Sequence, residues 1–420
     1  MKFVTLNENE FTEFENTHPL GSFYQTIKWG KLKEKNGWKY YLVGVKEDDK
    51  VIAACLLLEK KVFLSLTLFY SPRGFLLDYN NKKLLEFFTK NVKKFAKMHH
   101  AIFIKIDPTI IEFEKDINGD AIKGGISNKN IIDSLKSLGY KNVNTHLQPN
   151  IVFTLDLKNK TIDEIYNKME NTTRQRVRKN ESIGIKTREL SRDELSIFKS
   201  IMQNTADRRG FIDRPLSYYE NMYDIFDNMK ILLSYIDIKE YSNNEKIRLN
   251  KTTDEIKKLK ESLNKENANT KKINNKLKEA EVLAKSLEKT IKKCEDIIKK
   301  ENTNIINLGC LMFMFHGREV LSLFGGVYDE YREFMPAYTL NYDMIKYACE
   351  NGYDKYNFYG IDEYKDKSNP MYGLYDFKRG FSGVVEEYIG TYDLIISKFW
   401  YFMYTFAYNK VYLKIKSSKH

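Results

Sequence analysis

Residues 40–58 read YYLVGV-KEDDK-VIAACLLL, and this stretch decides which fold class the sequence predicts. The runs 40–45 and 51–58 are short, apolar and rich in residues that favour strands. The polar residues 46–50 between them favour a turn. We therefore expect a pair of consecutive strands here, with a third strand at 62–70.

Helical and strand-like segments follow this pair. Apolar residues recur at helical spacing through 82–98, and the apolar run 101–106 stops at Asp107-Pro108. A short helix is expected at 130–138, before Gly139. Consecutive strands mixed with single helices predict an α/β (α+β) domain with a mixed sheet.

A second round of the same kind begins at Asn150. Its strands are expected at 151–157, 185–190, 230–237, 307–315, 319–325 and 355–359, and its helices at 161–180, 192–209, 217–226 and 336–351. Two similar rounds suggest an ancient duplication, although the sequence holds no exact repeat.

An insertion at 240–304 interrupts the second round. Apolar residues keep a 4-3 spacing between 273 and 298 and the complementary 3-4 spacing between 249 and 263, with a polar break at 265–271. This pattern predicts an antiparallel coiled-coil hairpin. The segment 239–302 holds 18 basic and 12 acidic residues, which leaves +6. Polyanion binding explains this surplus, but so do solvated lysines on an arm that serves dimerisation or spacing.

Composition limits the kinds of partner. The chain has 420 residues, of which 42% are hydrophobic and 14% aromatic, so two to three folded units are expected rather than disorder. Its net charge of +12 favours nucleic acid, phosphorylated ligands or an anionic membrane surface, without choosing among them. The N-terminus lacks a signal peptide's apolar core and no apolar stretch reaches the roughly 20 residues of a membrane span, so a cytoplasmic protein is expected.

Motifs of several common chemistries are missing. The 4 cysteines show no CxxC spacing and the 6 histidines no HExxH cluster, so no metal is expected. A GxSxG nucleophile, a P-loop and a dinucleotide-binding GxGxxG are absent. The turn with which acetyltransferases grip the coenzyme A pyrophosphate is also missing, although the strand pattern otherwise resembles their fold.

One basic cluster lies on a single expected helix. It consists of Arg174, Arg176, Arg178 and Lys179, and the first and third of these share a face because they are four residues apart. Arginine donates bidentately to phosphate, so the face suits a polyanion. A solvated helix face explains the same residues equally well.

Two further cations stand in distinctive surroundings. Arg214 precedes Pro215 and a pair of tyrosines, a rigid setting that suits a diphosphate, although an ion pair with Asp213 or Asp224 is an alternative. Lys378 follows Phe377, and an ammonium beside an apolar ring can stabilise an oxyanion in acyl transfer. Taken by itself, Lys378 fits a surface lysine better.

Several segments together resemble the Fem family (FemA, FemB, FemX and relatives), which builds the peptide cross-bridge of Gram-positive cell walls. The resemblance covers nearly the whole chain. It rests on Phe23-Tyr24-Gln25-Thr26 with 29–33, Ser71-Pro72-Arg73-Gly74 with Asp78, the basic helix 174–179, 214–219, 356–360, Phe377-Lys378-Arg379-Gly380 and Glu387-Tyr388-Ile389-Gly390. Each motif alone is weak, but their order and the place of the insertion make the set strong.

The resemblance implies two GNAT-like (acetyltransferase-like) domains with mixed sheets, and an antiparallel coiled-coil arm inserted in the second. The expected division is 1–149 for the first domain, 150–239 with 305–395 for the second, 240–304 for the arm and 396–420 for a C-terminal aromatic and basic helix. The implied activity is aminoacyl transfer from aminoacyl-tRNA, which serves as co-substrate with no other cofactor. The implied acceptor is the stem peptide of a peptidoglycan precursor, either lipid II or UDP-MurNAc-pentapeptide.

Residue by residue, the resemblance implies that Lys33 and Arg214 hold the diphosphate of the precursor, with Tyr218 as a hydrogen-bonding neighbour and Arg73 also in the substrate site. Lys378, beside Phe377, is implied in the transfer step. The basic helix 174–179 is implied in tRNA binding. The chain departs from some relatives at Leu323-Phe324, where they place a substrate-contacting tyrosine.

The implied reaction needs no covalent enzyme intermediate, because the ester on tRNA is already activated. The attacking amine must lose a proton, for which Asp107 is a candidate base, although a structural cap fits Asp107 better. Lys378 would stabilise the oxyanion or the departing ribose oxygen. The sequence does not indicate whether Gly, Ala or Ser is transferred. It mildly favours the lipid-linked acceptor.

Alternatives of other classes remain. A coenzyme A-dependent N-acyltransferase has the same strand pattern, and a non-catalytic coiled-coil interaction protein has the same arm. The aromatic and basic residues 399–416 suit contact with the inner face of a membrane, but also a helix packed on the second domain. Homo- or hetero-oligomers with other Fem proteins are a further expectation of the resemblance.

Overall fold

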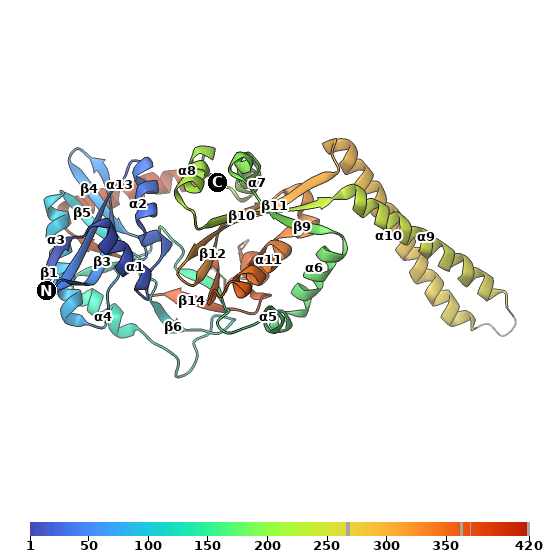
Figure 1. Ribbon diagram of the computed structural model, residues 1–420, viewed down its shortest axis with the longest axis horizontal. Helices are drawn as coiled ribbons and strands as arrows, with labels where there is room; N and C mark the ends of the chain where they lie inside the picture. The colour runs from blue at the N-terminus through green and yellow to red at the C-terminus, as the bar shows by residue number, and fades with distance from the viewer. Residues whose placement is uncertain (266–268, 362–363, 370, 418–420) are drawn as a thin grey trace.

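The computed structural model describes residues 1–420 except 266–268, 362–363, 370 and 418–420 (Figure 1). Its strands form two mixed sheets, in each of which one pair of strands is parallel, β4 with β5 and β12 with β13. The seven strands of the first sheet, in spatial order, are β1 (Lys2–Thr5), β2 (Lys39–Glu47), β3 (Lys50–Phe63), β4 (Leu66–Ser71), β5 (Ala101–Ile106), β15 (Thr391–Ile395) and β7 (Tyr140–Val143).

The second sheet has eight strands. In spatial order they are β6 (Ile111–Glu114), β14 (Val384–Tyr388), β8 (Ile151–Asp156), β13 (Lys355–Gly360), β12 (Glu319–Val327), β11 (Ile305–His316), β10 (Met229–Asp237) and β9 (Ile185–Glu189). The expected α/β class with two mixed sheets is therefore confirmed.

The helices cover both sheets and form the arm. Those of the first sheet are α1 (Glu8–Thr17), α2 (Ile27–Lys35), α3 (Lys82–Met98), α4 (Lys129–Ser137) and the C-terminal α13 (Lys398–Ser417). Those of the second are α5 (Ile162–Lys168), α6 (Asn171–Ser182), α7 (Leu195–Arg209), α8 (Leu216–Ile225), α11 (Pro336–Glu350) and α12 (Tyr372–Arg379). The arm consists of α9 (Ile238–Leu263) and α10 (Thr270–Glu301).

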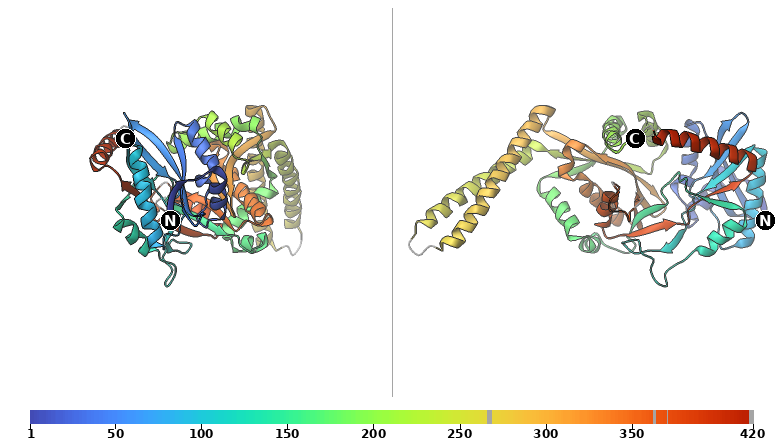
Figure 2. Two further views of the ribbon diagram at one scale, coloured as in Figure 1. Left: turned by 60° about the vertical axis from the view of Figure 1, so that its left-hand side comes forward. Right: turned by 180° about the vertical axis from the view of Figure 1, so that it is seen from behind.

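The arm continues directly from the paired strands β10 and β11 and projects away from the body (Figures 1 and 2). Ala280, Leu287, Ile291 and Cys294, all expected at the seam, are buried. Ile297 is buried where Ile298 was expected, because α10 turns its last residues toward the second sheet. The helical hairpin therefore has the position and seam that the spacing predicts.

Strand pairing crosses the expected domain boundaries. β6, from the first 149 residues, pairs with β14 at the edge of the second sheet. β15, which precedes residue 396, pairs with β5 and β7 in the first sheet. The expected contiguous division at residues 149 and 395 therefore needs correction. Hydrogen bonding between distant segments decides to which sheet a strand belongs.

Two further expectations about elements need correction. The expected strand 62–70 begins four residues later, since Phe63 still belongs to β3 and Leu64 turns the chain with a positive φ of 50°. The expected helix 161–180 is two helices. Met169 and Glu170 separate them with extended backbone, because the Glu170 amide donates to the carbonyl of Gly380 instead of continuing the helix.

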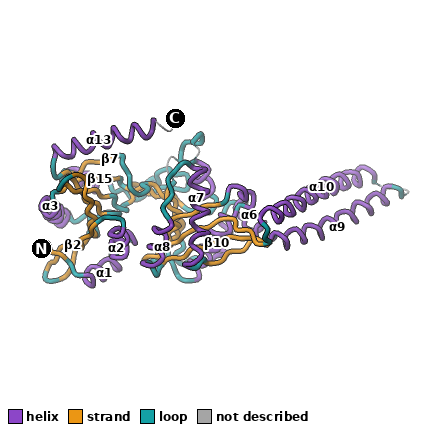
Figure 3. The backbone as a smooth tube through the Cα atoms, turned by 90° about the horizontal axis from the view of Figure 1, so that it is seen from above, coloured by secondary structure: helices purple, strands orange, loops and turns teal. Residues whose placement is uncertain are grey.

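The two domains share one hydrophobic core. Phe23, Trp29 and Tyr70 of the first domain pack in the same cluster as Tyr219 and Met312 of the second. Figure 3 shows the two sheets side by side in the body, with the arm at the far end from α3. A shared apolar core holds two domains in one orientation more firmly than a polar interface would.

Candidate active site

The boundary between the two sheets brings together tyrosines from both domains. The Tyr24 hydroxyl lies 2.6 Å from the Tyr359 hydroxyl, and the Tyr359 hydroxyl donates to Oε1 of Gln148 at 2.5 Å. Because Tyr359 gives its proton to Gln148, Tyr24 is the donor in the tyrosine pair. Burial raises the pKa of both tyrosines, so both hydroxyls stay protonated and hold this chain of hydrogen bonds.

Arg73 is enclosed by the same tyrosines. Its guanidinium carbon lies 5.6 Å from the ring centre of Tyr24, 5.9 Å from that of Tyr359 and 5.5 Å from that of Tyr388. Nη1 donates to the Pro149 carbonyl at 3.0 Å, and the side chain is buried. This enclosure favours a clamp between the domains over the direct substrate contact that the resemblance implies for Arg73.

Asp107, the candidate base, is buried beneath this cluster. Oδ2 accepts from the Tyr70 hydroxyl at 2.7 Å and Oδ1 from the Arg73 amide at 2.6 Å. Burial raises the pKa of the carboxyl. Since both oxygens already accept from the protein, the geometry favours the capping role of Asp107, which fixes the turn at Arg73 and its positive φ of 62°.

Lys33 and Arg214 form a pair of cations from the two domains. Lys33 lies near the end of α2, with Nζ 4.6 Å from the Trp29 ring centre. Arg214 precedes α8, and its guanidinium carbon lies 5.2 Å from the ring centre of Tyr218. Burial, followed by the charge of Arg214, lowers the pKa of Lys33 to about 8.

Carboxylates near these two cations have other partners. Asp213 accepts from Lys199 at 2.6 Å and from the Tyr219 hydroxyl at 2.5 Å, and Asp224 pairs with Arg192. The alternative in which Arg214 pairs with Asp213 or Asp224 is therefore wrong. Among the residues that the structure describes, neither Lys33 nor Arg214 has a carboxylate within ion-pair distance. Two adjacent cations in this state favour an anionic ligand.

Lys378 is buried near the end of α12, so the expectation of a surface lysine is wrong. Its Nζ donates to the carbonyl of Gly360 at 2.7 Å and lies 3.3 Å from the carbonyl of Tyr359. The backbone of Tyr359 has a positive φ of 67°, which a non-glycine residue rarely adopts. Strained backbone at the end of β13 therefore places two carbonyls around the ammonium.

Phe377, a residue of α12, packs against two neighbouring aromatic rings. Its ring centre lies 4.9 Å from that of Tyr338 and 5.5 Å from that of Phe381, both edge-on. Phe377 thus packs α12 against Tyr338 of α11, and this contact helps to hold the neighbouring Lys378 at the end of β13.

Tyr218 and Tyr359 connect the cation pair to the buried lysine. Both tyrosines pack in the hydrophobic cluster shared by the domains. Burial raises the pKa of the Tyr218 phenol, so it remains a hydrogen-bond donor beside Arg214. The structure thus brings together Lys33, Arg214, Tyr218 and Lys378, which are far apart in the sequence, along the boundary of the two domains.

The basic helix α6 lies beside α12. A Cβ added at Gly380 would stand 2.1 Å from Oγ1 of Thr173, and Arg379 pairs with Glu170 at 3.3 Å. Arg178 and Lys179 are exposed, whereas Arg174 donates to the Asn167 carbonyl. Burial raises the pKa of the Tyr338 phenol, and the nearby guanidinium of Arg176 opposes this rise. Figure 1 shows α6 on the side of the second domain from which the arm projects.

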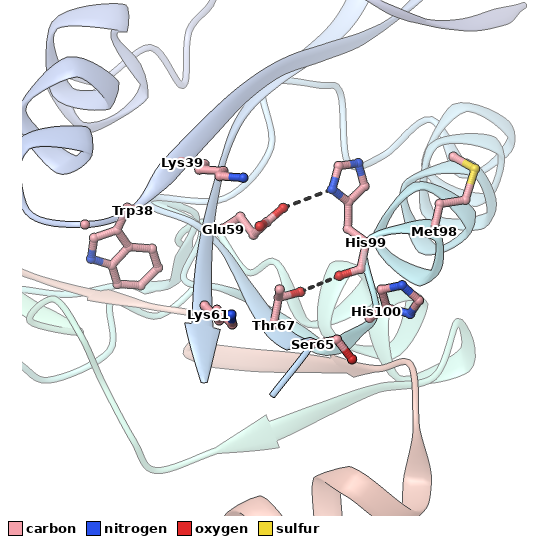
Figure 4. A pocket seen from close by; sticks show the side chains of 10 residues that line it. Trp38, Lys39, Glu59, Lys61, Ser65, Thr67, Met98, His99 and His100 are labelled. Atoms are coloured by element: carbon pink, nitrogen blue, oxygen red, sulfur yellow. Dashed lines mark hydrogen bonds and ion pairs between the residues drawn. The ribbon is translucent and has the colours of Figure 1, made fainter. Parts of the chain in front are cut away.

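A separate cavity of about 560 Å³ lies at the other end of the first sheet (Figure 4). His99 and Glu59 form a pair at 2.9 Å on its wall, and Trp38 and Lys61 also line it. The cavity contains none of the candidate site residues. No cluster of metal-ligating side chains occurs within the described part of the chain.

Sequence reasoning gave no role to Tyr24, Gln25 and Tyr359, although each lies in a quoted motif. The buried Gln25 donates to Oγ of Ser71 at 3.1 Å and to the Gly74 carbonyl at 2.9 Å, and so anchors the loop that carries Arg73. Their place in these motifs was the signal available, because their hydrogen-bond partners lie far away in the sequence.

Three comparisons relate this chain to known proteins. The family model "FemAB family" matches residues 6–409. Aminoacyltransferase FemA of Staphylococcus aureus is 32% identical over 416 residues, which covers 96% of this chain and 98% of that protein. Aminoacyltransferase FemA of Staphylococcus epidermidis is 34% identical over 419 residues, with the same shares of 96% and 98%.

Solved structures agree in fold. The crystal structure of FemX is 30% identical, with a TM-score of 0.73 over 96% of this chain and 99% of that one. A tandem GNAT protein from the clavulanic acid biosynthesis pathway is 8% identical, with a TM-score of 0.50 over 94% and 98%, and shows the fold alone. The chain has two GNAT-like domains, and it belongs to the FemAB family.

Proposed function

We propose that this chain transfers glycine, alanine or serine from aminoacyl-tRNA to the stem peptide of a peptidoglycan precursor. Curated relatives that match along nearly their whole length are aminoacyltransferases, and the chain is an aminoacyltransferase of the family that makes the peptidoglycan bridge. The observation that carries the finer proposal is the cation pair Lys33 and Arg214, which lacks a carboxylate partner in the described structure and lies along the same boundary as the buried Lys378.

The cation pair suits the diphosphate of the precursor. A diphosphate carries charges on both phosphates, and an arginine and a lysine from different domains can each bind one of them. Tyr218, beside Arg214, would donate to the same group. Binding of an anion would also raise the pKa of Lys33, which burial and then the neighbouring guanidinium lower, and so would favour its charged form.

Lys378 would act on the transferring carbonyl. As the stem-peptide amine attacks the aminoacyl ester, the carbonyl oxygen becomes negative and the ribose oxygen then departs with the electron pair of the broken ester bond. A positioned ammonium stabilises either charge. The carbonyls of Tyr359 and Gly360 orient this ammonium before the reaction begins.

The geometry favours an acceptor other than Asp107 for the proton of the attacking amine, because both Asp107 oxygens accept hydrogen bonds within the fold. The departing ribose oxygen takes up one proton overall, so acid and base requirements balance within the substrates. Orientation of the amine against the ester then supplies much of the rate enhancement.

The tRNA would approach from the side of α6 and the arm. Arg178 and Lys179 are exposed on α6, which packs against the helix that carries Lys378. The segment 239–302 adds a charge of +6 to the same side of the second domain. Phosphate contacts of this kind position a nucleic acid without reading its sequence.

The deciding experiment offers a pool of charged, radiolabelled tRNAs together with either the lipid-linked or the UDP-linked precursor. Transfer of label to the stem peptide is expected, and the labelled product identifies both donor and acceptor. Absence of transfer to both acceptors by folded protein, together with binding of coenzyme A, would instead favour a coenzyme A-dependent N-acyltransferase. Absence of both would favour an interaction protein.

A further inference from the structure

The C-terminal helix α13 is aromatic on two sides. One side packs on the first sheet, where the buried Tyr401 donates to Oδ2 of Asp393 at 2.9 Å and meets the Phe103 ring edge-on at 5.5 Å. Tyr404 contacts the same ring at 5.4 Å. These contacts fix the rotation of the helix about its axis, and with it the direction of the other side.

The other side is a stripe of large apolar residues in solvent. Its members are spaced by three and four residues, which places them on one face of a helix. They are Phe399, Phe402, Met403 and Phe406, with exposed fractions of 65%, 65%, 42% and 50%. Phe402 and Phe406 stack with ring centres 6.3 Å apart. A helix already anchored by Tyr401 does not need these side chains for folding, and contiguous exposed apolar groups indicate an interaction surface.

The turn between β3 and β4 extends this apolar surface. Phe63 and Leu64 are 60% and 71% exposed. Thr67 of β4 pairs with Ala101 of β5, and the amide of Ser397, just before α13, donates to the Ile102 carbonyl at 3.1 Å. The turn and the first residues of α13 therefore lie at the same end of the first sheet.

The segment that carries the stripe is basic in composition. Residues 398–420 contain five lysines and no aspartate or glutamate, and Lys60 and Lys61 precede the exposed turn. Aromatic residues with flanking lysines are the composition of helices that lie in the interface of an anionic bilayer. No helix in the described part of the chain is long and apolar enough to cross a membrane, so the stripe suits an interfacial position.

The location of α13 relates the stripe to the candidate site. Leu66 and Leu68 of β4 pack with Tyr401, whereas Tyr70 packs in the core shared with Trp29 of α2. Alternate residues of a strand point to one face, so α13 covers the same face of the first sheet as α2, which carries Lys33. The apolar stripe and Lys33 thus belong to elements on one face of this domain.

We propose that the exposed stripe of α13, with Phe63 and Leu64, docks this protein on the surface of an anionic lipid bilayer. The docking is independent of the transfer reaction, since neither tRNA nor precursor takes part in it. Its physical basis is burial of the aromatic side chains at the level of the headgroups, together with attraction between the anionic lipids and the basic composition of residues 398–420.

The test is flotation of the full chain with vesicles of phosphatidylglycerol and phosphatidylcholine in equal amounts, and with vesicles of phosphatidylcholine alone. Phe402→Ser combined with Phe406→Ser removes two exposed rings without touching the buried side of the helix. The matched control is Val282→Ser, which removes an exposed apolar side chain, 63% accessible, from the arm.

The wild-type chain is expected to float with the anionic vesicles, and the double variant to lose roughly tenfold or more in apparent affinity. The control variant is expected to float as the wild type does. Equal flotation of the double variant and the wild type, or none by either, would overturn the proposal.

Sedimentation tests self-association as the other use of the stripe. If the wild type does not bind vesicles but forms a dimer, and the double variant is a monomer, the stripe serves self-association instead. Transfer to a soluble UDP-linked acceptor is expected to be unchanged in the double variant, which separates this test from that of the reaction.

Discussion

The hydroxyl of Tyr24 donates to the hydroxyl of Tyr359 at 2.6 Å, and this bond joins the two domains beside the candidate site. Tyr24 follows α1 in the first domain, and Tyr359 ends β13 in the second. The backbone of Tyr359 in turn presents its carbonyl to Lys378. The orientation of the buried lysine therefore depends on a contact between domains.

Replacing Tyr24 by Phe is expected to reduce transfer by roughly tenfold and the free energy of unfolding by about 1 kcal/mol, because one buried hydrogen bond between the domains is lost. Thermal unfolding and initial transfer rates measure the two effects. Tyr392→Phe is the matched control, since it removes a buried hydroxyl that donates to the Ile389 carbonyl, away from Lys378. If the control variant loses as much activity as the Tyr24 variant, the loss results from lower stability of the fold and not from the contact between the domains.

Lys378→Met is expected to lower the rate of transfer by roughly two to three orders of magnitude while affinity for the precursor changes little, because an ammonium that meets developing charge acts on the transition state. Single-turnover transfer and equilibrium binding of the UDP-linked precursor measure the two quantities. Arg379→Met removes the adjacent cation, which pairs with Glu170, and should retain activity. Unchanged turnover in the Lys378 variant contradicts the assignment.

Arg214→Gln is expected to weaken precursor binding by roughly 1.5–3 kcal/mol, because the diphosphate loses a charged hydrogen-bond donor. Isothermal titration with the UDP-linked precursor measures the change. Arg192→Gln is the control, since Arg192 pairs with Asp224 on the surface and has no place in the site. If the Arg214 variant binds the precursor with normal affinity, the diphosphate site lies in another part of the molecule.

Precursor affinity is expected to depend on the protonation of Lys33, whose pKa is lowered to about 8 by burial and then by Arg214. The charged form binds the diphosphate, so affinity is greatest below this pKa and falls as the pH rises through it. The effect of Lys33 on folding stability has the opposite dependence on pH. Below pH about 8, burial of the charged lysine destabilises the folded state. This destabilisation is relieved as the pH rises from about 8 to the unfolded pKa near 10.4. Lys33→Arg keeps its charge throughout, so titrations at several pH values should show a flatter profile for this variant. Identical pH profiles for the wild type and the variant argue against Lys33 as the titrating group.

Arg178→Gln with Lys179→Gln is expected to weaken binding of tRNA and to make it less dependent on salt, because each lost phosphate contact removes about one released counterion. Filter binding of tRNA at several salt concentrations measures the slope. Lys82→Gln with Lys83→Gln changes the same charge at exposed positions of α3, distant from α6. An equal change of slope in both double variants indicates a general charge effect and not a tRNA site on α6.

Local sequence patterns predicted most helices and strands of the chain. The apolar runs 40–45 and 51–58 around a polar turn give the hairpin of β2 and β3, and the heptad spacing gives the arm with its buried Leu287 and Ile291. These patterns succeed because a strand or a helix buries one side wherever it packs, so its period appears in the sequence before any partner is known. The order of weak motifs likewise indicated the family without any contact between them.

The sequence by itself determined the α/β class, the place of the arm and the types of residue available to a site. Only the tertiary structure decided that Lys378 is buried against the carbonyls of Tyr359 and Gly360, that Asp107 caps a turn, and that β6 and β15 exchange between the sheets. The physical reason is the range of the interactions. Periodic burial is encoded within a few neighbouring residues, whereas the surroundings of a single lysine and the partner of an edge strand depend on other segments of the chain, which for β6 and β15 lie hundreds of residues away.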